Sequence, residues 1–99
     1  MPEHPLKTIE RLDPKLARLI EDTQQLALSD GALPKKFKLL IALSLDAAHG
    51  VTDGVNALAR AAMQSGATKE EITEALRVVQ FVCGVVRVYP ASQALSELF

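Results

Sequence analysis

The chain has 99 residues, 48% of them hydrophobic, and a formal net charge of −1. This length is typical of one domain, and interleaved acids and bases without a basic stripe argue against nucleic-acid binding. Residues 1–12 lack the apolar core of a signal peptide, and no window reaches the ~18 apolar residues that a membrane-spanning helix requires. We therefore expect a single cytoplasmic domain, residues 1–99, with no membrane partner.

The composition favours helices. The chain contains three Phe, one Tyr and no Trp, so its core must be built from Leu, Ile, Val and Ala, which suits packed helices better than sheets. A chain this short leaves much apolar surface uncovered as a monomer, and residues 78–88 are apolar almost without interruption. The sequence predicts an all-α domain of about five helices that assembles with copies of itself.

Residues 1–12 are expected to form a loosely ordered N-terminal extension. Asp13 followed by Pro14 is typical of a helix start, because the first is an N-cap residue and the second suits the first helical position. Apolar residues then recur at helical spacing. We expect this first helix to end near Gly31.

A second helix is predicted from Pro34 to the His49-Gly50 pair. Its residues 39–48 are apolar on nearly every face, apart from Ser44 and Asp46. A helix that is apolar all round belongs in the middle of a core or an assembly.

A third helix is predicted over residues 52–65, ending before Gly66, which is a typical residue after a helix end. Thr68 with Glu71 three positions later forms a capping box, so a fourth helix begins at Lys69.

The C-terminal part allows two interpretations. Gly84 interrupts the far end of the fourth helix, and the valine-rich residues 85–88 fit either a helix or an extended segment. Pro90 is expected to open a short terminal helix over residues 91–98.

Residues 34–72, PKKFKLLIALSLDAAHGVTDGVNALARAAMQSGATKEEI, carry a family resemblance. The apolar run, the glycine break, the small-residue helix and the Gly66-Ala67-Thr68 turn resemble the carboxymuconolactone decarboxylase family, including its alkyl hydroperoxide reductase D-like branch. The resemblance covers residues 20–98. It implies a helical bundle of that type that forms homo-trimers or homo-hexamers, with a cleft close to the subunit contacts.

The resemblance also assigns the family's reactive groups to positions that hold other residues here. The Cys-x-x-Cys pair of the hydroperoxide-reductase-like branch falls on Val51 and Gly54, the following His on Leu58, and the relay Glu on Leu39. A disulfide relay requires two thiols, so the resemblance implies a protein without thiol peroxidase chemistry. The resemblance also implies that the decarboxylase branch carries a His at the position held here by Leu58. The usual acid or base of that branch is therefore missing from this chain as well.

Four polar residues near these positions are spaced three or four apart, which aligns them on one face if the helical path continues: Asp46, His49, Asp53 and Asn56. One interpretation makes His49 and Asp53 a catalytic acid–base pair, in which the carboxylate orients the imidazole. The alternative is that the His49 imidazole donates a hydrogen bond to carbonyl groups left unpaired at the end of one helix, and that Asp53 caps the start of the next helix.

Asn56 and Arg60 are the candidate substrate-binding residues. Arg60 falls on the helix that lines the cleft in the family that this chain resembles. A guanidinium on an apolar helix holds a carboxylate, which belongs either to a ligand or to an inter-helix or inter-subunit salt bridge.

The sequence predicts no metal site and no cofactor-dependent chemistry. His4 falls in the N-terminal extension, so the two histidines make no metal site, and no cofactor is predicted. Cys83 is the one cysteine of the sequence. We expect it to pack as a small buried apolar side chain, since a reactive thiolate needs nearby positive charge or a helix N-terminus.

Two function classes remain. The first is an enzyme of the decarboxylase-like family that acts on or binds a small organic acid or lactone at a rewired site around the residues His49, Asp53, Asn56 and Arg60. The second is a noncatalytic oligomeric scaffold or binding protein on the same fold. The helical pattern favours the first class, and the missing reactive groups favour the second.

Overall fold

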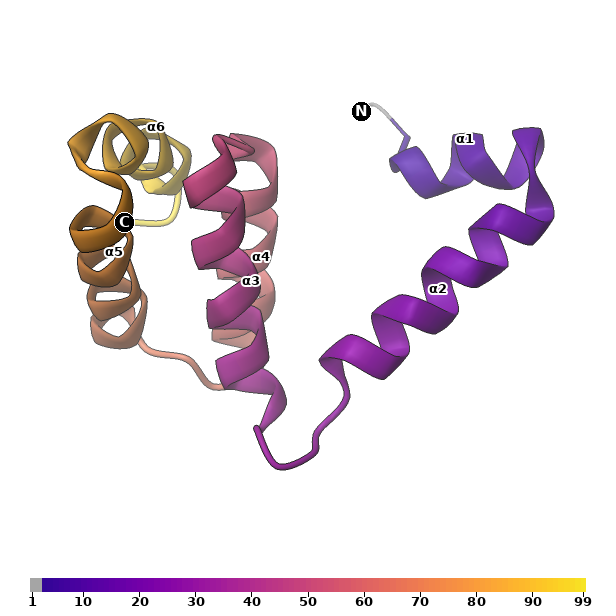
Figure 1. The fold of residues 1–99 in the computed structure, drawn as a ribbon, viewed down its shortest axis with the longest axis horizontal. Helices are drawn as coiled ribbons and strands as arrows, with labels where there is room; N and C mark the ends of the chain where they lie inside the picture. Colours follow the sequence, from indigo (N-terminus) through magenta and orange to yellow (C-terminus); the bar gives the residue numbers. More distant parts are fainter. Residues whose placement is uncertain (1–2) are drawn as a thin grey trace.

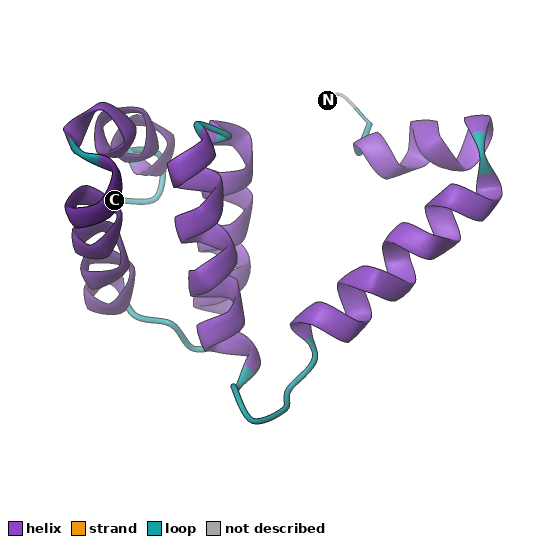
Figure 2. Cartoon of the chain, in the orientation of Figure 1, coloured by secondary structure: helices purple, strands orange, loops and turns teal. Residues whose placement is uncertain are grey.

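The computed structural model describes residues 3–99 and, over that range, contains helices and no strand (Figures 1 and 2). The predicted all-α fold is confirmed. Six helices follow one another along the described residues: α1 (Pro5–Leu12), α2 (Pro14–Leu28), α3 (Lys35–His49), α4 (Thr52–Gln64), α5 (Lys69–Cys83) and α6 (Val85–Leu95).

The helices form two parts, which we call the bundle and the arm. The bundle comprises α3 to α6, and in it α3 packs against the other three helices. The arm comprises α1 and α2, which extend away from the bundle so that the chain outlines a V (Figure 1). The Cα radius of gyration is 14.3 Å, larger than the ~13 Å of a compact chain of this length, because the arm stands apart.

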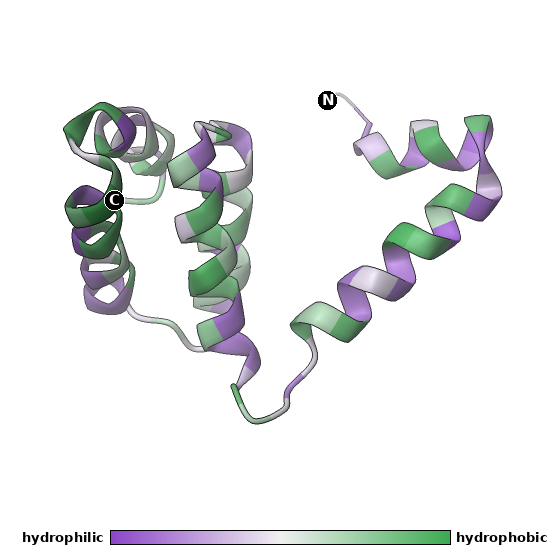
Figure 3. Cartoon of the chain, viewed as in Figure 1, coloured by the Kyte–Doolittle hydropathy of each residue, from purple (hydrophilic) through white to green (hydrophobic). Residues whose placement is uncertain are grey.

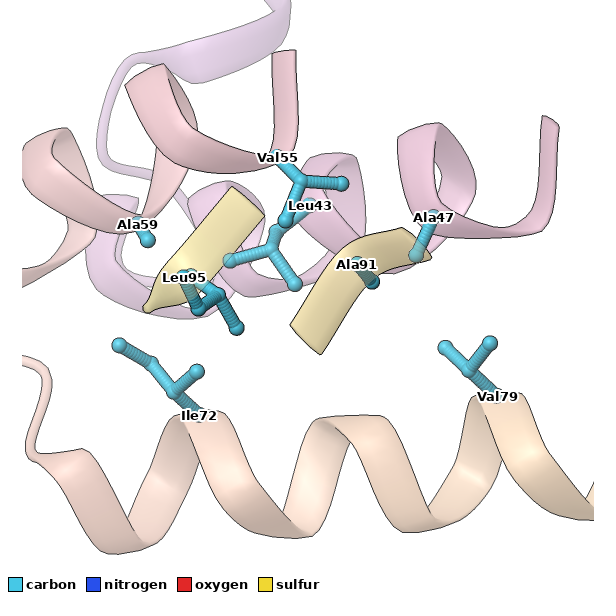
Figure 4. Close-up of a cluster of buried hydrophobic side chains, with 8 residues drawn as sticks. All are labelled: Leu43, Ala47, Val55, Ala59, Ile72, Val79, Ala91 and Leu95. Atoms are coloured by element: carbon cyan, nitrogen blue, oxygen red, sulfur yellow. The ribbon is translucent and has the colours of Figure 1, made fainter. Parts of the chain in front are cut away.

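The core of the bundle is a cluster of aliphatic side chains from all four of its helices (Figure 4). Leu43 of α3, Val55 of α4 and Ile72 of α5 are each at most 1% exposed. Fully burying a side chain of this size contributes about 1.5–3 kcal/mol, and small side chains between them let the helices approach closely. The cluster consists of Leu43, Ala47, Val55, Ala59, Ile72, Val79, Ala91 and Leu95.

A second, smaller cluster anchors the arm to the bundle. Leu39, Ala62 and Ala67 are buried together, and Leu28 at the end of α2 packs against them. Residues 29–34 then form the elbow between α2 and α3.

The start of α5 confirms the predicted capping box. Thr68 Oγ1 accepts a hydrogen bond from Glu71 N (3.1 Å), and Glu71 Oε1 accepts one from Thr68 N (2.9 Å). Glu71 Oε2 also lies 3.1 Å from Lys36 Nζ, which joins the start of α5 to the start of α3. The backbone hydrogen bond from Thr68, followed by the Lys36 ammonium, lowers the pKa of Glu71 from its ordinary value of 4.5.

The N-terminal prediction needs correction, because residues 5–12, expected as a loosely ordered extension, form α1. His4 caps this helix, since its Nδ1 accepts a hydrogen bond from Leu6 N (3.1 Å). Pro5 occupies the first helical turn, where its missing N–H would have had no helical acceptor.

The C-terminal prediction also needs correction. α6 begins at Val85, and Pro90, expected to open the helix, lies inside it. The extended alternative for residues 85–88 is wrong. Gly84, with a φ of 81°, separates α5 from α6, and the core contacts made by one side of α6 override both the β propensity of valine and the cost of an internal proline.

Candidate functional site

The predicted site lies where α3 ends and α4 begins. Gly50 ends α3 in the left-handed conformation, with a φ of 76°, and Val51 N then donates to the Asp46 carbonyl (2.9 Å). α4 begins at Thr52, and in the described chain no side chain caps its first N–H groups. Asp53 is therefore a residue of the first turn rather than the cap that one interpretation expects. The start of α4 presents unpaired donors and the positive end of the helix dipole.

His49 completes the end of α3. Its Nδ1 lies 2.7 Å from the Leu45 carbonyl oxygen, and because a carbonyl only accepts, Nδ1 is the donor of this contact. This contact is the capping role expected as the alternative for His49. Within residues 3–99, no hydrogen bond or ion pair joins His49 to Asp53, so the structure does not assemble the predicted acid–base pair.

The structure does bring Asn56 and Arg60 together, one turn apart on α4. Asn56 Nδ2 donates to the Ala94 carbonyl near the end of α6 (2.7 Å), and Arg60 Nε donates to Asn56 Oδ1 (2.8 Å). Arg60 Nη2 lies 3.6 Å from Glu97 Oε2. The two predicted binding residues thus tie α4 to the C-terminal end of the chain, as the salt-bridge alternative for Arg60 expects.

A polar groove opens beside this network, between the start of α4 and the second half of α6. Its volume is about 360 Å³, within the range of small-molecule sites. Asp53 and Asn56 line it, whereas His49 and Arg60 do not. The lining residues are Thr52, Asp53, Asn56, Pro90, Gln93, Ala94 and Glu97.

Asp46 makes a contact that its place in the polar series does not predict. A Cβ built on Gly54 would lie 2.0 Å from Asp46 Oδ2 and 2.9 Å from Asp46 Cγ, so the carboxylate occupies the space that a side chain at residue 54 would need. A Cβ built on Gly50 would lie 3.0 Å from Arg87 Nη1 of α6. A glycine inside a predicted helix, as at Gly54, is the signal that marks such a close approach.

Comparison with known families shows which family the chain belongs to. The sequence profile of the carboxymuconolactone decarboxylase family matches residues 14–97, which span α2 to α6 and most of the chain. The chain belongs to the carboxymuconolactone decarboxylase family. The predicted membership of this family is thereby confirmed.

Two proteins similar to this family member give the same picture of its extent. Uncharacterized protein MJ1511 of Methanocaldococcus jannaschii is 26% identical over 98 residues, which are 99% of this chain and 92% of that protein. The crystal structure of apo-lpg0406, a carboxymuconolactone decarboxylase family protein from Legionella pneumophila, has a TM-score of 0.85 and 30% identity, covering 91% of this chain and 80% of that one. The arrangement of helices is therefore that of a solved family structure.

The one cysteine of this carboxymuconolactone decarboxylase family member contributes to packing. Cys83 ends α5, is half-buried and packs against the core cluster. In the part of the chain that the structure describes, no three His, Cys, Asp or Glu side chains gather as metal ligands would. No helix among residues 3–99 is long and apolar enough to cross a membrane.

Proposed function

We propose that the protein binds a small organic acid or lactone in the groove at the start of α4, and that it works without thiol peroxidase chemistry. The observation that carries this proposal is that a helix start without a side-chain cap lies at the edge of a polar groove of ligand size. N–H groups at such a helix start attract a carboxylate or a carbonyl oxygen. The family name indicates the chemical class, since a carboxymuconolactone is both an acid and a lactone.

The groups around the groove divide into donors and acceptors. In this proposal the Thr52 hydroxyl and the N–H groups of residues 52–54 would donate to ligand oxygens, and Asp53, which lines the groove, would supply a carboxylate. In turnover, Asp53 would accept a proton from the carbon next to a ligand carbonyl, and the N–H groups would hold the oxygen that gains negative charge. In the neutral imidazole, His49 Nε2 would be the second proton acceptor at this end of α3.

The proposed binding is tested by amide NMR on ¹⁵N-labelled protein. Titration with a γ-lactone that carries a carboxylate is expected to shift the amide signals of residues 52–54. Among residues 3–99 no side chain caps the start of α6 either, and this start lies away from the groove. The amides of Val85 and Val86 are therefore an internal control for nonspecific anion binding. Equal shifts at both helix starts, or unshifted signals at α4, would overturn the proposal.

A noncatalytic scaffold is the second candidate function. It is supported by the engagement of His49, Asn56 and Arg60 in contacts within the chain. Large apolar side chains on α5 also point to assembly, because Phe81 and Val82 are 88% and 72% exposed.

Either function is proposed to operate in a homo-trimer or homo-hexamer, the states that the resemblance implies, because closed symmetry covers apolar surfaces. Native mass spectrometry separates the two candidates. A trimer or hexamer that retains a stoichiometric organic acid supports the groove. A ligand-free oligomer that also lacks the amide shifts supports the scaffold, and a monomer contradicts the assembly.

A further inference from the structure

The arm carries an apolar stripe that the described chain leaves partly exposed. Leu16, Leu19, Ile20 and Leu26 recur along α2 at spacings that place them on one side of the helix, and apolar segments recur along the arm in Figure 3. Leu19 is 62% exposed and Leu26 is 80% exposed. A helix of 15 residues is marginal in water by itself, so α2 needs a surface to pack on.

The outer side of α3 carries a matching stripe. Phe37, Ile41 and Leu45 follow one another at four-residue spacing and are 41%, 49% and 55% exposed, whereas Leu43 on the other side is fully buried. α2 and α3 each contain 15 residues, which is about 22 Å of helix. The two stripes are therefore similar in length as well as in chemistry.

The elbow, residues 29–34, keeps each arm off its own bundle. Lys35 N donates to Asp30 Oδ1 (2.6 Å), and Lys38 Nζ donates to the Ser29 carbonyl (2.8 Å). These bonds tie the elbow to the first turn of α3 in the open geometry of Figure 1. In a single chain with this elbow, both stripes remain exposed.

We propose that α2 of one copy packs antiparallel along α3 of a second copy, stripe against stripe, so that each copy gives an arm and receives one. This direction favours the charges, because it places Asp22 toward Lys38 and keeps Lys15 away from the lysines at the start of α3. The parallel direction would instead place Lys15 beside the lysines at the start of α3.

The area available matches a stable interface. The seven side chains of the two stripes expose on the order of 100 Å² of apolar surface apiece, so a reciprocal exchange of two arms covers on the order of 1,000 Å². Stable interfaces bury about 1,200–2,000 Å² in total, and somewhat more than half of that area is apolar. The exchanged arms with their polar edges reach this range.

Disulfide trapping tests the contact and its direction. Two proteins are made in the Cys83→Ser background, one with Leu19→Cys and the other with Ile41→Cys, each with a different tag. Mild oxidation of the mixture is expected to link the two tags. Gln25→Cys, on the opposite side of α2, replaces Leu19→Cys in the matched control and is expected not to link. Absent linkage, or equal linkage in the control, overturns the proposal.

Charge substitution provides a second test that does not depend on oxidation. Leu19→Glu is expected to weaken self-association by roughly 30-fold or more, as a hot-spot substitution does, and Ile41→Lys on the partner is expected to restore it. Gln25→Glu adds the same charge outside the stripe and is expected to leave association unchanged. Sedimentation showing unaltered assembly of Leu19→Glu overturns the contact. The groove residues lie outside both stripes, so the amide titration reports on the proposed function separately.

Discussion

Gly54→Ala is expected to destabilise the protein, although alanine is the better helix former. In an open helix this change stabilises by about 0.5–1 kcal/mol. Here the new Cβ would lie 2.0 Å from Asp46 Oδ2 and 2.9 Å from Asp46 Cγ. Because Cγ is also too close, turning the carboxylate about χ2 gives no relief, and χ1 of Asp46 must change.

The magnitude follows from the rotamers open to Asp46. One of the three χ1 wells is blocked by the preceding turn of α3, an off-rotamer side chain costs about 0.5–1.5 kcal/mol, and overpacking costs about 1–3 kcal/mol. After the helix gain is subtracted, the net loss in Gly54→Ala is about 1 kcal/mol. In an Asp46→Ala background the obstacle is absent, so the same change is expected to stabilise by about 0.5–1 kcal/mol. The coupling energy between the two sites is therefore about 2 kcal/mol.

Urea unfolding followed by circular dichroism on the wild type, the two single variants and the double variant measures this coupling. All four proteins are compared at one protein concentration, because assembly makes stability depend on concentration. A Gly54→Ala protein more stable than wild type, or equal effects of Gly54→Ala in both backgrounds, would refute the argument that the Asp46 carboxylate fills the space beside residue 54.

Five other substitutions test separate parts of the structure. Thr68→Ala removes a hydrogen bond of the capping box and is expected to cost about 1 kcal/mol, measured as a lower urea midpoint. Folding lowers the pKa of Glu71 from 4.5, so the ionised carboxylate stabilises the folded state fully above pH 4.5. This stabilisation is lost as the pH falls through the lowered pKa. Below pH 4.5 the urea midpoint of wild type should therefore fall more than that of Glu71→Gln, and parallel curves would contradict the assignment. Cys83→Ser and wild type are both expected to consume an organic hydroperoxide only at the rate measured in buffer without protein, since a single thiol supports no disulfide relay. Thiol-dependent turnover in wild type would contradict this. His49→Ala and Asp53→Ala are expected to keep the circular dichroism spectrum and to abolish any lactone or organic-acid turnover of the wild type, and full activity in both variants would reject the rewired site.

Helix boundaries with a local chemical cause can be predicted from the sequence. Asp13 Oδ1 accepts from Leu16 N (3.1 Å) at the start of α2, and the Thr68 box joins residues three positions apart. Such bonds join near neighbours, so the residue types at fixed spacing are sufficient. The tolerance of Pro90 inside α6 depends instead on packing against helices distant in sequence, which no local pattern contains.

The candidate site divides in the same way. Asn56 and Arg60 lie four residues apart, a spacing at which side chains meet on a helix, and Arg60 Nε donates to Asn56 Oδ1. The Ala94 carbonyl that Asn56 reaches is 38 residues away, and the proximity of Asp46 to Gly54 crosses from one helix to the next. Those partners are set by tertiary packing and could not be derived from periodicity.

The positions that the family resemblance assigns to reactive groups serve packing in this member. Leu39, at the position of the relay Glu, is 2% exposed in the second cluster, and Leu58, at the position of the His, packs against both clusters. Gly54, at the position of the second Cys, leaves room for Asp46. A carboxylate introduced at residue 39 would be a buried charge without a partner, which costs several kcal/mol. Family membership here depends on the helical core, whereas chemistry depends on the few groups around a site. The side chains that line the groove and those of the arm stripe lie at other positions.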